Sequence, residues 1–167
     1  MSFPQLFMEQ VKITPAVAIT LGNASATGDR VSLENYRRCG ILVRQDQGAA
    51  DAATVTVNMY TAASGGSSST GITINDWWYM ADVTHGTTAD TWTKGTAAAS
   101  ITTSATGSGE SFYFIDIDAE DLFASGTNYP FIAVAFTGDG SASNTIQADY
   151  FLYGARYGED ALPSAQS

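Results

Sequence analysis

The sequence holds one histidine and one cysteine, His85 and Cys39, and these two side chains are the first to test for catalysis. A Ser-His-Asp triad needs His85, but no Gly-x-Ser-x-Gly elbow occurs in the sequence to present a nucleophilic serine. A nucleophilic Cys39 would need His85 beside it, and one His and one Cys cannot supply a tetrahedral zinc site. We therefore expect a protein that is not an enzyme and that uses no cofactor.

Carboxylates gather in one short stretch, at Asp116, Asp118, Glu120 and Asp121. Glycosidases place two carboxylates across a sugar, which consecutive positions on one short turn rarely provide. Oxygens with this spacing can converge on Ca²⁺, but the stretch lacks the glycine and the distal glutamate of an EF-hand loop. We favour the other interpretation, a short helical turn capped by Asp118 with acidic residues in its first turn.

Three aromatic residues follow one another at Trp77, Trp78 and Tyr79. Neighbouring side chains of a strand point to opposite faces, so the two tryptophans cannot both face one core. The outward one would lie at a protein interface, under a covering loop, or beneath a sugar ring. We favour the interface, and both Trp77 and Trp78 are candidates for it.

The basic residues are few and unevenly distributed. Four of the seven are arginines between positions 30 and 44, whereas residues 76–160 contain twelve acidic residues and two basic ones. The basic region of one copy could dock on the acidic region of another copy, or of a different partner, by electrostatic attraction. The alternative is that the arginines are solvated and neutralise local carboxylates. Arg37, Arg38, Arg156 and Tyr157 join the interface candidates.

The first twelve residues place Phe3, Leu6, Phe7 and Met8 around a proline, with neither the period of a strand nor that of a helix. Burying these side chains contributes roughly 1.5–3 kcal/mol each, enough to offset the ordering of a short arm. We predict that residues 1–12 form an arm that packs on another subunit through these four residues. The alternative is an arm that covers an open edge of its own sheet.

Strand patterns predict the elements that position these candidates. Residues 36–44 alternate, with Cys39, Ile41 and Val43 on one face, and residues 54–60 alternate more strictly still. About eight such segments are separated by turn residues, and none has the period of a helix. The pattern predicts an all-β fold, an antiparallel β-sandwich with jelly-roll-like topology. An immunoglobulin-like sandwich is the alternative, but the sequence lacks its paired cysteines.

Length and charge limit the organisation and the partners. With 167 residues, the chain is expected to form one sandwich domain over residues 13–157, preceded by the arm and followed by a tail at 158–167. The formal charge of −10 argues against nucleic acid and against an anionic membrane as partners. No apolar run approaches a spanning helix and the first residues do not resemble a signal peptide, so we expect synthesis in a cytoplasm.

The composition favours a structural role. Ala, Thr, Ser and Gly make up 77 of the 167 residues, while charged residues supply 14%. Ordinary domains carry about 25% charged residues. Few charges together with many small residues and threonines are typical of a β-rich structural protein whose surface is partly covered by neighbours.

Three stretches of the sequence resemble small virion proteins of tailed bacteriophages. They are Tyr-Arg-Arg-Cys-Gly-Ile-Leu-Val at 36–43, Ala-Ala-Asp-Ala-Ala-Thr-Val-Thr-Val at 49–57, and Leu-Tyr-Gly-Ala-Arg-Tyr at 152–157. Their order, with an Asp-Ala-Glu-Asp-Leu turn at 118–122 between the last two, resembles the head decoration or cement proteins of these phages.

This resemblance implies a non-enzymatic protein on the capsid surface of the virion, made in the host cytoplasm. Its partners would be the major capsid protein or other virion proteins, and copies of itself in a homo-oligomer, with a trimer favoured. It would bind the assembled phage head and stabilise it. Two alternatives stay open. One is a carbohydrate-binding or adhesin module, indicated by Trp77, Trp78, Trp92 and the acidic turn at 116–121. The other is another virion subunit, such as a head–tail adaptor or tail protein.

Overall fold

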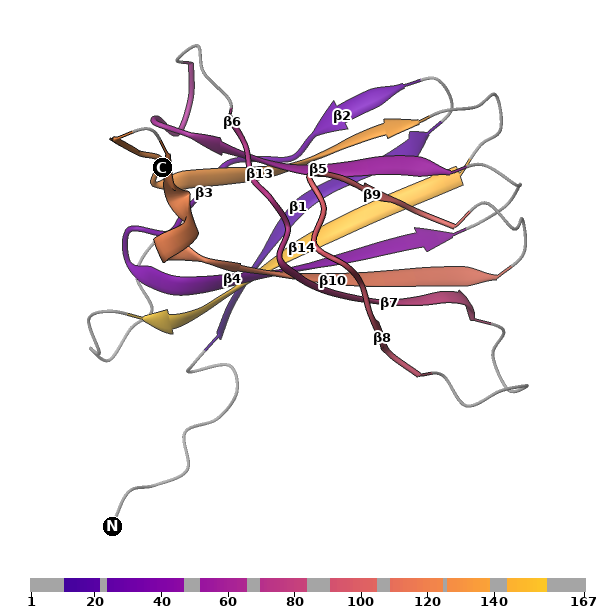
Figure 1. Cartoon of the computed structure of the whole chain (residues 1–167). Coiled ribbons are helices and arrows are strands. Elements are labelled where there is room, and N and C mark those ends of the chain that lie inside the picture. The colour runs from indigo at the N-terminus through magenta and orange to yellow at the C-terminus, as the bar shows by residue number, and fades with distance from the viewer. Residues whose placement is uncertain are drawn as a thin grey trace.

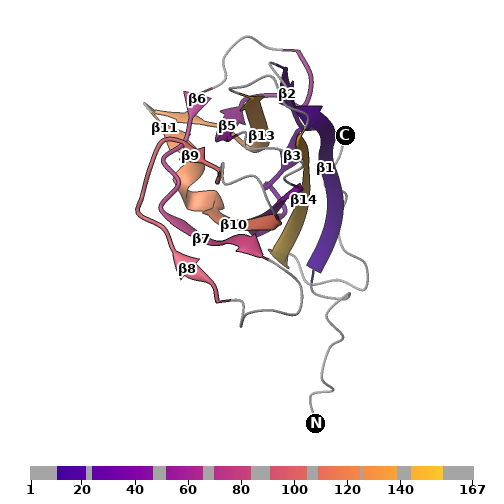
Figure 2. The ribbon, with the colours of Figure 1, turned by 90° about the vertical axis from the view of Figure 1, so that its right-hand side faces the viewer.

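The computed structural model describes residues 11–21, 24–46, 52–65, 70–83, 91–104, 109–124, 126–138 and 144–155. In these ranges the chain is mostly strand and forms two antiparallel sheets that pack face to face (Figures 1 and 2). The predicted all-β sandwich is therefore confirmed. Among the same residues, no helix is long and apolar enough to cross a membrane.

The first sheet has six strands in the order β1-β14-β4-β10-β7-β8. They are β1 (Val11–Leu21), β14 (Asn144–Ala155), β4 (Tyr36–Asp46), β10 (Glu110–Asp118), β7 (Asp76–Val83) and β8 (Thr93–Lys94). The second sheet contains β2 (Ser25–Thr27), β13 (Phe131–Gly138), β5 (Ala53–Tyr60) and β6 (Thr70–Gly71), with β3 (Val31–Ser32) on β13 and β9 (Ile101–Thr102) on β5. A 3-10 turn, η1 (Ala119–Leu122), and the short hairpin of β11 (Phe123–Ala124) and β12 (Thr127–Asn128) lie at one end of the sandwich (Figure 1).

The strand pairing is nested along the chain. β1 pairs with β14, β2 with β13, and β4 with β10. Nested pairing of this kind winds one long hairpin into two Greek keys, which is the jelly-roll arrangement. β4 and β5 belong to different sheets, so residues 46–53 connect the two layers. Alternation identifies a strand but does not identify its partner.

One hydrophobic core fills the space between the sheets. The predicted inward residues Cys39, Ile41 and Val43 are fully buried there, which confirms the assigned face of β4. The two layers are also joined by a polar contact, because the buried Tyr150 hydroxyl on β14 accepts a hydrogen bond of 2.9 Å from the backbone N–H of Val134 on β13. This contact satisfies a buried backbone donor that would otherwise be costly.

β1 begins earlier than the sequence pattern indicates. The sandwich domain was expected to start at residue 13, whereas Val11 already pairs with Tyr153 of β14. Pro15 interrupts the strand pattern in the sequence, because proline cannot donate a hydrogen bond to a neighbouring strand. It is tolerated here because β1 is an edge strand whose register shifts between Pro15 and Val17. The last two residues of the expected arm therefore belong to the sheet. Residues 1–10, with Phe3, Leu6, Phe7 and Met8, lie outside the described residues, as do residues 156–167.

Candidate functional site

The two neighbouring tryptophans face opposite sides of the first sheet, as alternation predicts. Trp77 packs against the core, and its indole N–H donates a 2.8 Å hydrogen bond to the carbonyl oxygen of Thr96. The segment that follows β8 lies close over this ring, since a Cβ placed on Gly95 would sit only 2.0 Å from Trp77 Cε2. Trp77 is thus a structural residue beneath a covering segment. Trp78 is the tryptophan that faces outward.

Large apolar side chains surround Trp78 on the outward side of the sheet. Trp78 on β7 is in register with Phe114 on β10, and Phe114 is in register with Leu42 on β4. The ring centroids of Trp78 and Phe114 are 6.4 Å apart. The outer aromatic face, as we call it, consists of Leu42, Trp78, Met80, Phe112, Phe114 and Phe151, all half-buried. Ile13 of β1, paired with Phe151 and 41% exposed, extends it to the edge of the sheet.

Gly40 makes this surface continuous. It lies on β4 between Phe151 of β14 and Asp116 of β10, and the ring of Phe114 leans over it. A Cβ on Gly40 would lie 2.6 Å from Phe114 Cζ and 3.6 Å from Phe151 Cβ. Only a residue without a side chain lets the Phe114 ring rest there. The glycine therefore allows aromatic side chains from β10 and β14 to approach each other across β4.

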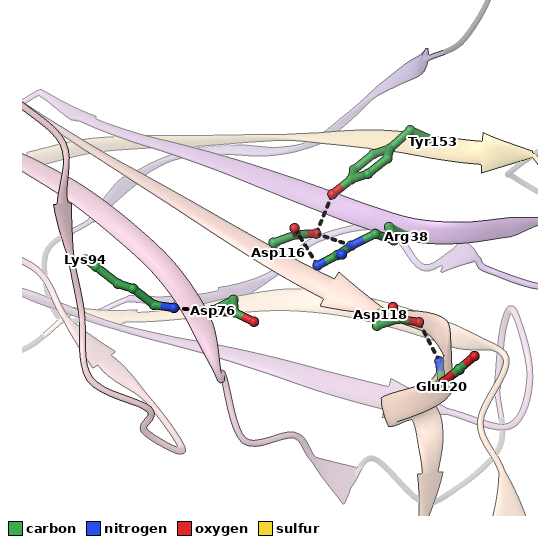
Figure 3. A network of polar contacts seen from close by, with 7 residues as sticks. All are labelled: Arg38, Asp76, Lys94, Asp116, Asp118, Glu120 and Tyr153. Atoms are coloured by element: carbon green, nitrogen blue, oxygen red, sulfur yellow. Dashed lines mark hydrogen bonds and ion pairs between the residues drawn. The ribbon is translucent and has the colours of Figure 1, made fainter.

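A polar network borders the face on the side where β10 ends (Figure 3). Asp116 accepts hydrogen bonds from Arg38 Nε at 3.2 Å and from the Tyr153 hydroxyl at 2.5 Å, and its other oxygen lies 2.7 Å from Arg38 Nη2. Burial lowers the pKa of Arg38, but the charge of Asp116 outweighs it and the pKa is raised. Burial first, and then the hydrogen bond to Asp116, raise the pKa of Tyr153. At neutral pH the network is therefore an ion pair with a neutral tyrosine.

Two further ion pairs lie at the borders of the face. The Lys94 ammonium lies 2.8 Å from Asp76 Oδ1, and the hydrogen bond and charge of Lys94 lower the pKa of Asp76 (Figure 3). The same ammonium lies 5.4 Å from the centroid of the Trp78 ring. A sugar stacking on Trp78 would have to displace this cation. Arg44 pairs with Glu110 at another border. Each of these basic side chains faces an acidic one. Asp149 of β14, in register with Leu42, adds one further carboxylate on the outward side of the sheet.

The acidic stretch forms the predicted capped turn. Asp118 Oδ1 accepts a 3.0 Å hydrogen bond from the backbone N–H of Glu120 and so caps η1 (Figure 3). Burial, and next the charge of Asp118, raise the pKa of Asp121. Among the residues that the structure describes, no group of three or more His, Cys, Asp or Glu side chains is placed to hold a metal ion. The carboxylates of this stretch thus serve a cap and an ion pair.

The remaining candidates are dispersed. Cys39 is a core thiol whose pKa is raised by burial, so it is not a ready nucleophile, and His85 lies outside the described residues. Arg37 is exposed and its side chain lies beside Gly154, apart from the network of Arg38. Of the predicted interface residues, Arg38 and Trp78 lie on the same outward side of the first sheet, on β4 and β7 with β10 between them. Arg156 and Tyr157 lie outside the described residues, as the arm does.

Most of the outer aromatic face was not identified from the sequence. Phe112 and Phe114 lie in β10, where every residue of 112–115 is large and apolar, so the sequence pattern does not separate an inner from an outer set. The one sequence feature that could have revealed the face is a strand with large apolar residues on both of its sides, because an outward side in water is usually polar. No protein-family model matches the chain, and no curated protein matches it.

Proposed function

We propose that this protein is a non-enzymatic structural subunit of a phage virion, a decoration or cement protein that attaches to the assembled head and stabilises it. The observation that carries the proposal is the outer aromatic face, an outward surface made of six large apolar side chains. Contiguous apolar surface of this kind on a sheet marks a place where another protein docks. The protein acts through the contacts of its surface.

The chemistry of the face suits a protein partner. Phe, Trp and Met are enriched in the buried centres of protein interfaces, and charged residues are depleted there. Here the charges of Arg38, Arg44 and Lys94 lie at the borders, each paired with a carboxylate. A central apolar patch with a polar rim is the usual anatomy of an interface. The net charge of −10 agrees with a protein partner better than with nucleic acid.

We assign the subunit to a phage head because three stretches of its sequence resemble phage decoration proteins. The sandwich fold and the composition, rich in small residues, agree with that assignment. In this role the face is buried by protein in the finished particle, and the sandwich adds contacts that oppose the opening of the shell. Hot-spot aromatic residues at such interfaces contribute about 2 kcal/mol or more each.

The test is attachment to DNA-filled heads of the tailed phage that carries the gene. The purified chain is mixed with the heads, and the protein that sediments with them is quantified, together with the temperature at which the heads release DNA. We expect the chain to co-sediment and to raise that temperature. Phe114→Ser should weaken attachment by about tenfold or more, because a buried aromatic contact is lost.

The matched control is Thr56→Ser, which changes an outward position of the opposite sheet and should leave attachment unchanged. Both variants are first checked for an unchanged circular dichroism spectrum. A chain that never sediments with heads contradicts the proposal. Binding to immobilised glycans that is lost in Trp78→Ala would replace it with the adhesin alternative.

A further inference from the structure

We infer that the outer aromatic face binds the N-terminal segment, residues 1–10, of a second copy of this chain, so that copies associate by exchanging these segments. The inference rests on the docking role that the proposed function gives to the face, and it names the partner.

The chemistry of the segment matches that of the face. Residues 1–10 contain two phenylalanines, two methionines and one leucine, and Glu9 is their one ionisable side chain. The segment after β14, residues 156–167, carries Arg156, Glu159 and Asp160 among its twelve residues and is less apolar. Of the two segments that flank the described sandwich, the first is the one suited to an apolar, aromatic surface.

Charge favours a segment over a second sandwich as the occupant. Each copy has a formal charge of −10, so two sandwiches brought face to face repel each other. Residues 1–10 bring one acidic side chain to the contact, and the basic groups beside the face are already paired with carboxylates. Contact through the segment therefore keeps most of the negative charge of the two copies apart. Association should accordingly persist, or strengthen, as salt is added.

The segment is long enough to cross the face. It joins β1 at Val11, and β1 is the edge strand of the same sheet (Figure 2). From β1 to β7 there are four strand spacings, about 19 Å in all at about 4.8 Å each. Ten extended residues span about 33 Å. A segment from a neighbouring copy can thus contact every strand that contributes to the face.

The direction of β1 favours a second copy over the segment's own sheet. The positions of β1 that are level with the face, Ile13 and Pro15, come after Val11 in the chain. A segment that covered its own face would have to reverse immediately before Val11. Residues 5–10 contain none of the Gly, Pro, Asn, Asp and Ser residues that favour tight turns, so the sequence disfavours a reversal next to Val11. A chain that instead continues the line of β1 leaves its own sheet for a neighbour.

The first test is the mass of the assembly in solution, measured by sedimentation velocity over a range of concentrations. The chain should be an oligomer, while deletion of residues 2–10 and, separately, Trp78→Glu should weaken association by about tenfold or more. Leu42→Glu replaces Trp78→Glu if that variant does not fold. The control is Phe123→Ser, which removes an aromatic residue that is 64% exposed outside the face and should leave the oligomer intact.

The second test is mixing, which separates exchange between copies from folding back within one copy. The deletion variant keeps an intact face, and Trp78→Glu keeps an intact segment. If segments are exchanged, the mixture forms a complex that neither variant forms alone. A synthetic peptide of residues 1–10 should also bind the deletion variant and shift its tryptophan emission.

The outcomes that overturn the inference are distinct from those that overturn the proposed function. A chain that is monomeric at every concentration, a deletion variant that stays oligomeric, or a mixture that forms no complex contradicts segment exchange. A monomer whose melting temperature falls on deletion places the segment on its own face and also contradicts it. An oligomer that depends on the segment but never sediments with phage heads contradicts the proposed function and leaves the inference standing.

Discussion

The outward surfaces of the two sheets are built from different side chains. On the first sheet, the outward positions of the central strands hold the aromatic residues and Leu42. On the second sheet, most outward positions of β5 and of its neighbour β13 are small or polar: Thr54, Thr56, Asn58, Ala135 and Thr137. The aromatic pair of this phase, Tyr60 and Phe131, lies at one end of the two strands, where the Arg30 guanidinium covers the Tyr60 ring. Both sheets are antiparallel and share one core, so the difference does not come from the fold.

The difference between the two sheets shows which outward surface departs from the usual pattern of an antiparallel sheet. An antiparallel sheet with one face in water usually has apolar residues inside and polar residues outside, and the second sheet follows this rule. The first sheet departs from it over four strands, in a chain where small residues are abundant. Composition alone would fill these positions with Thr, Ser and Ala, and the aromatic residues found there are the basis for our proposal that this surface contacts another protein.

The largest effect on stability should come from filling the space under Phe114. Gly40→Ala places a methyl group where the ring lies, 2.6 Å from Cζ, so the ring must move away from β4. We expect a loss of about 1–3 kcal/mol in the free energy of unfolding, as for other overpacked sites. Urea unfolding of a variant kept monomeric by deletion of residues 2–10 measures it.

Its control is Gly71→Ala on β6 of the second sheet, where the nearest atom to an added Cβ is Asn58 Oδ1 at 3.9 Å. This change should stay within about 0.5 kcal/mol, as for ordinary surface positions. Equal losses at Gly40 and Gly71 would show that the two outer surfaces are equally tolerant, and the contrast drawn between them would be wrong.

An intermediate effect is expected at the polar border of the aromatic face. Tyr153→Phe removes the hydroxyl that donates to Asp116 and leaves this carboxylate with Arg38. The free energy of unfolding should fall by about 0.5–1.5 kcal/mol, the usual contribution of one such hydrogen bond. On the second sheet, Tyr60→Phe keeps the ring beneath the Arg30 guanidinium, 3.7 Å away, and should cost less. Thermal unfolding of both variants at pH 7 makes the comparison.

The smallest effect concerns Asp121, and its sign depends on pH. Folding raises the pKa of this carboxyl above its ordinary value of 3.8, so the protonated form is favoured in the folded state. The ionised form is destabilising at neutral pH, and Asp121→Asn should therefore stabilise the protein there by less than about 0.5 kcal/mol, because the group is solvent-screened. The gain should disappear as the pH falls below about 4. A gain that is equal at pH 3 and pH 7 would contradict this assignment.

Local patterns predicted the faces of single strands well. Alternation placed Cys39, Ile41 and Val43 inside and required Trp77 and Trp78 to separate, because side chains on a strand have a period of two. It did not predict which tryptophan faces outward, since the period alone does not say on which side the second sheet lies. The capped turn at Asp118 was predictable because a cap is a contact within three residues.

The site was harder to predict because it depends on register between strands that are distant in sequence. Phe114 meets Leu42 and Trp78 only once β10 is placed between β4 and β7, and a shift of one residue would turn these side chains to the core. The same holds for Phe151, whose position over Gly40 depends on β14 pairing with β4. Nothing in the 36–43 stretch by itself shows that Gly40 accommodates a ring from β10.

The nested pairing of β1 with β14 has a practical consequence for protein engineering. Val11 pairs with Tyr153, so β1 starts and β14 finishes at the same end of the first sheet (Figure 1). Sequences attached before β1 and after β14 therefore leave the sandwich next to each other. In a chain trimmed to residues 11–155, two labels fused directly to Val11 and to Ala155 would be held close enough for energy transfer between fluorophores, and the sandwich would act as a scaffold that presents both on one side.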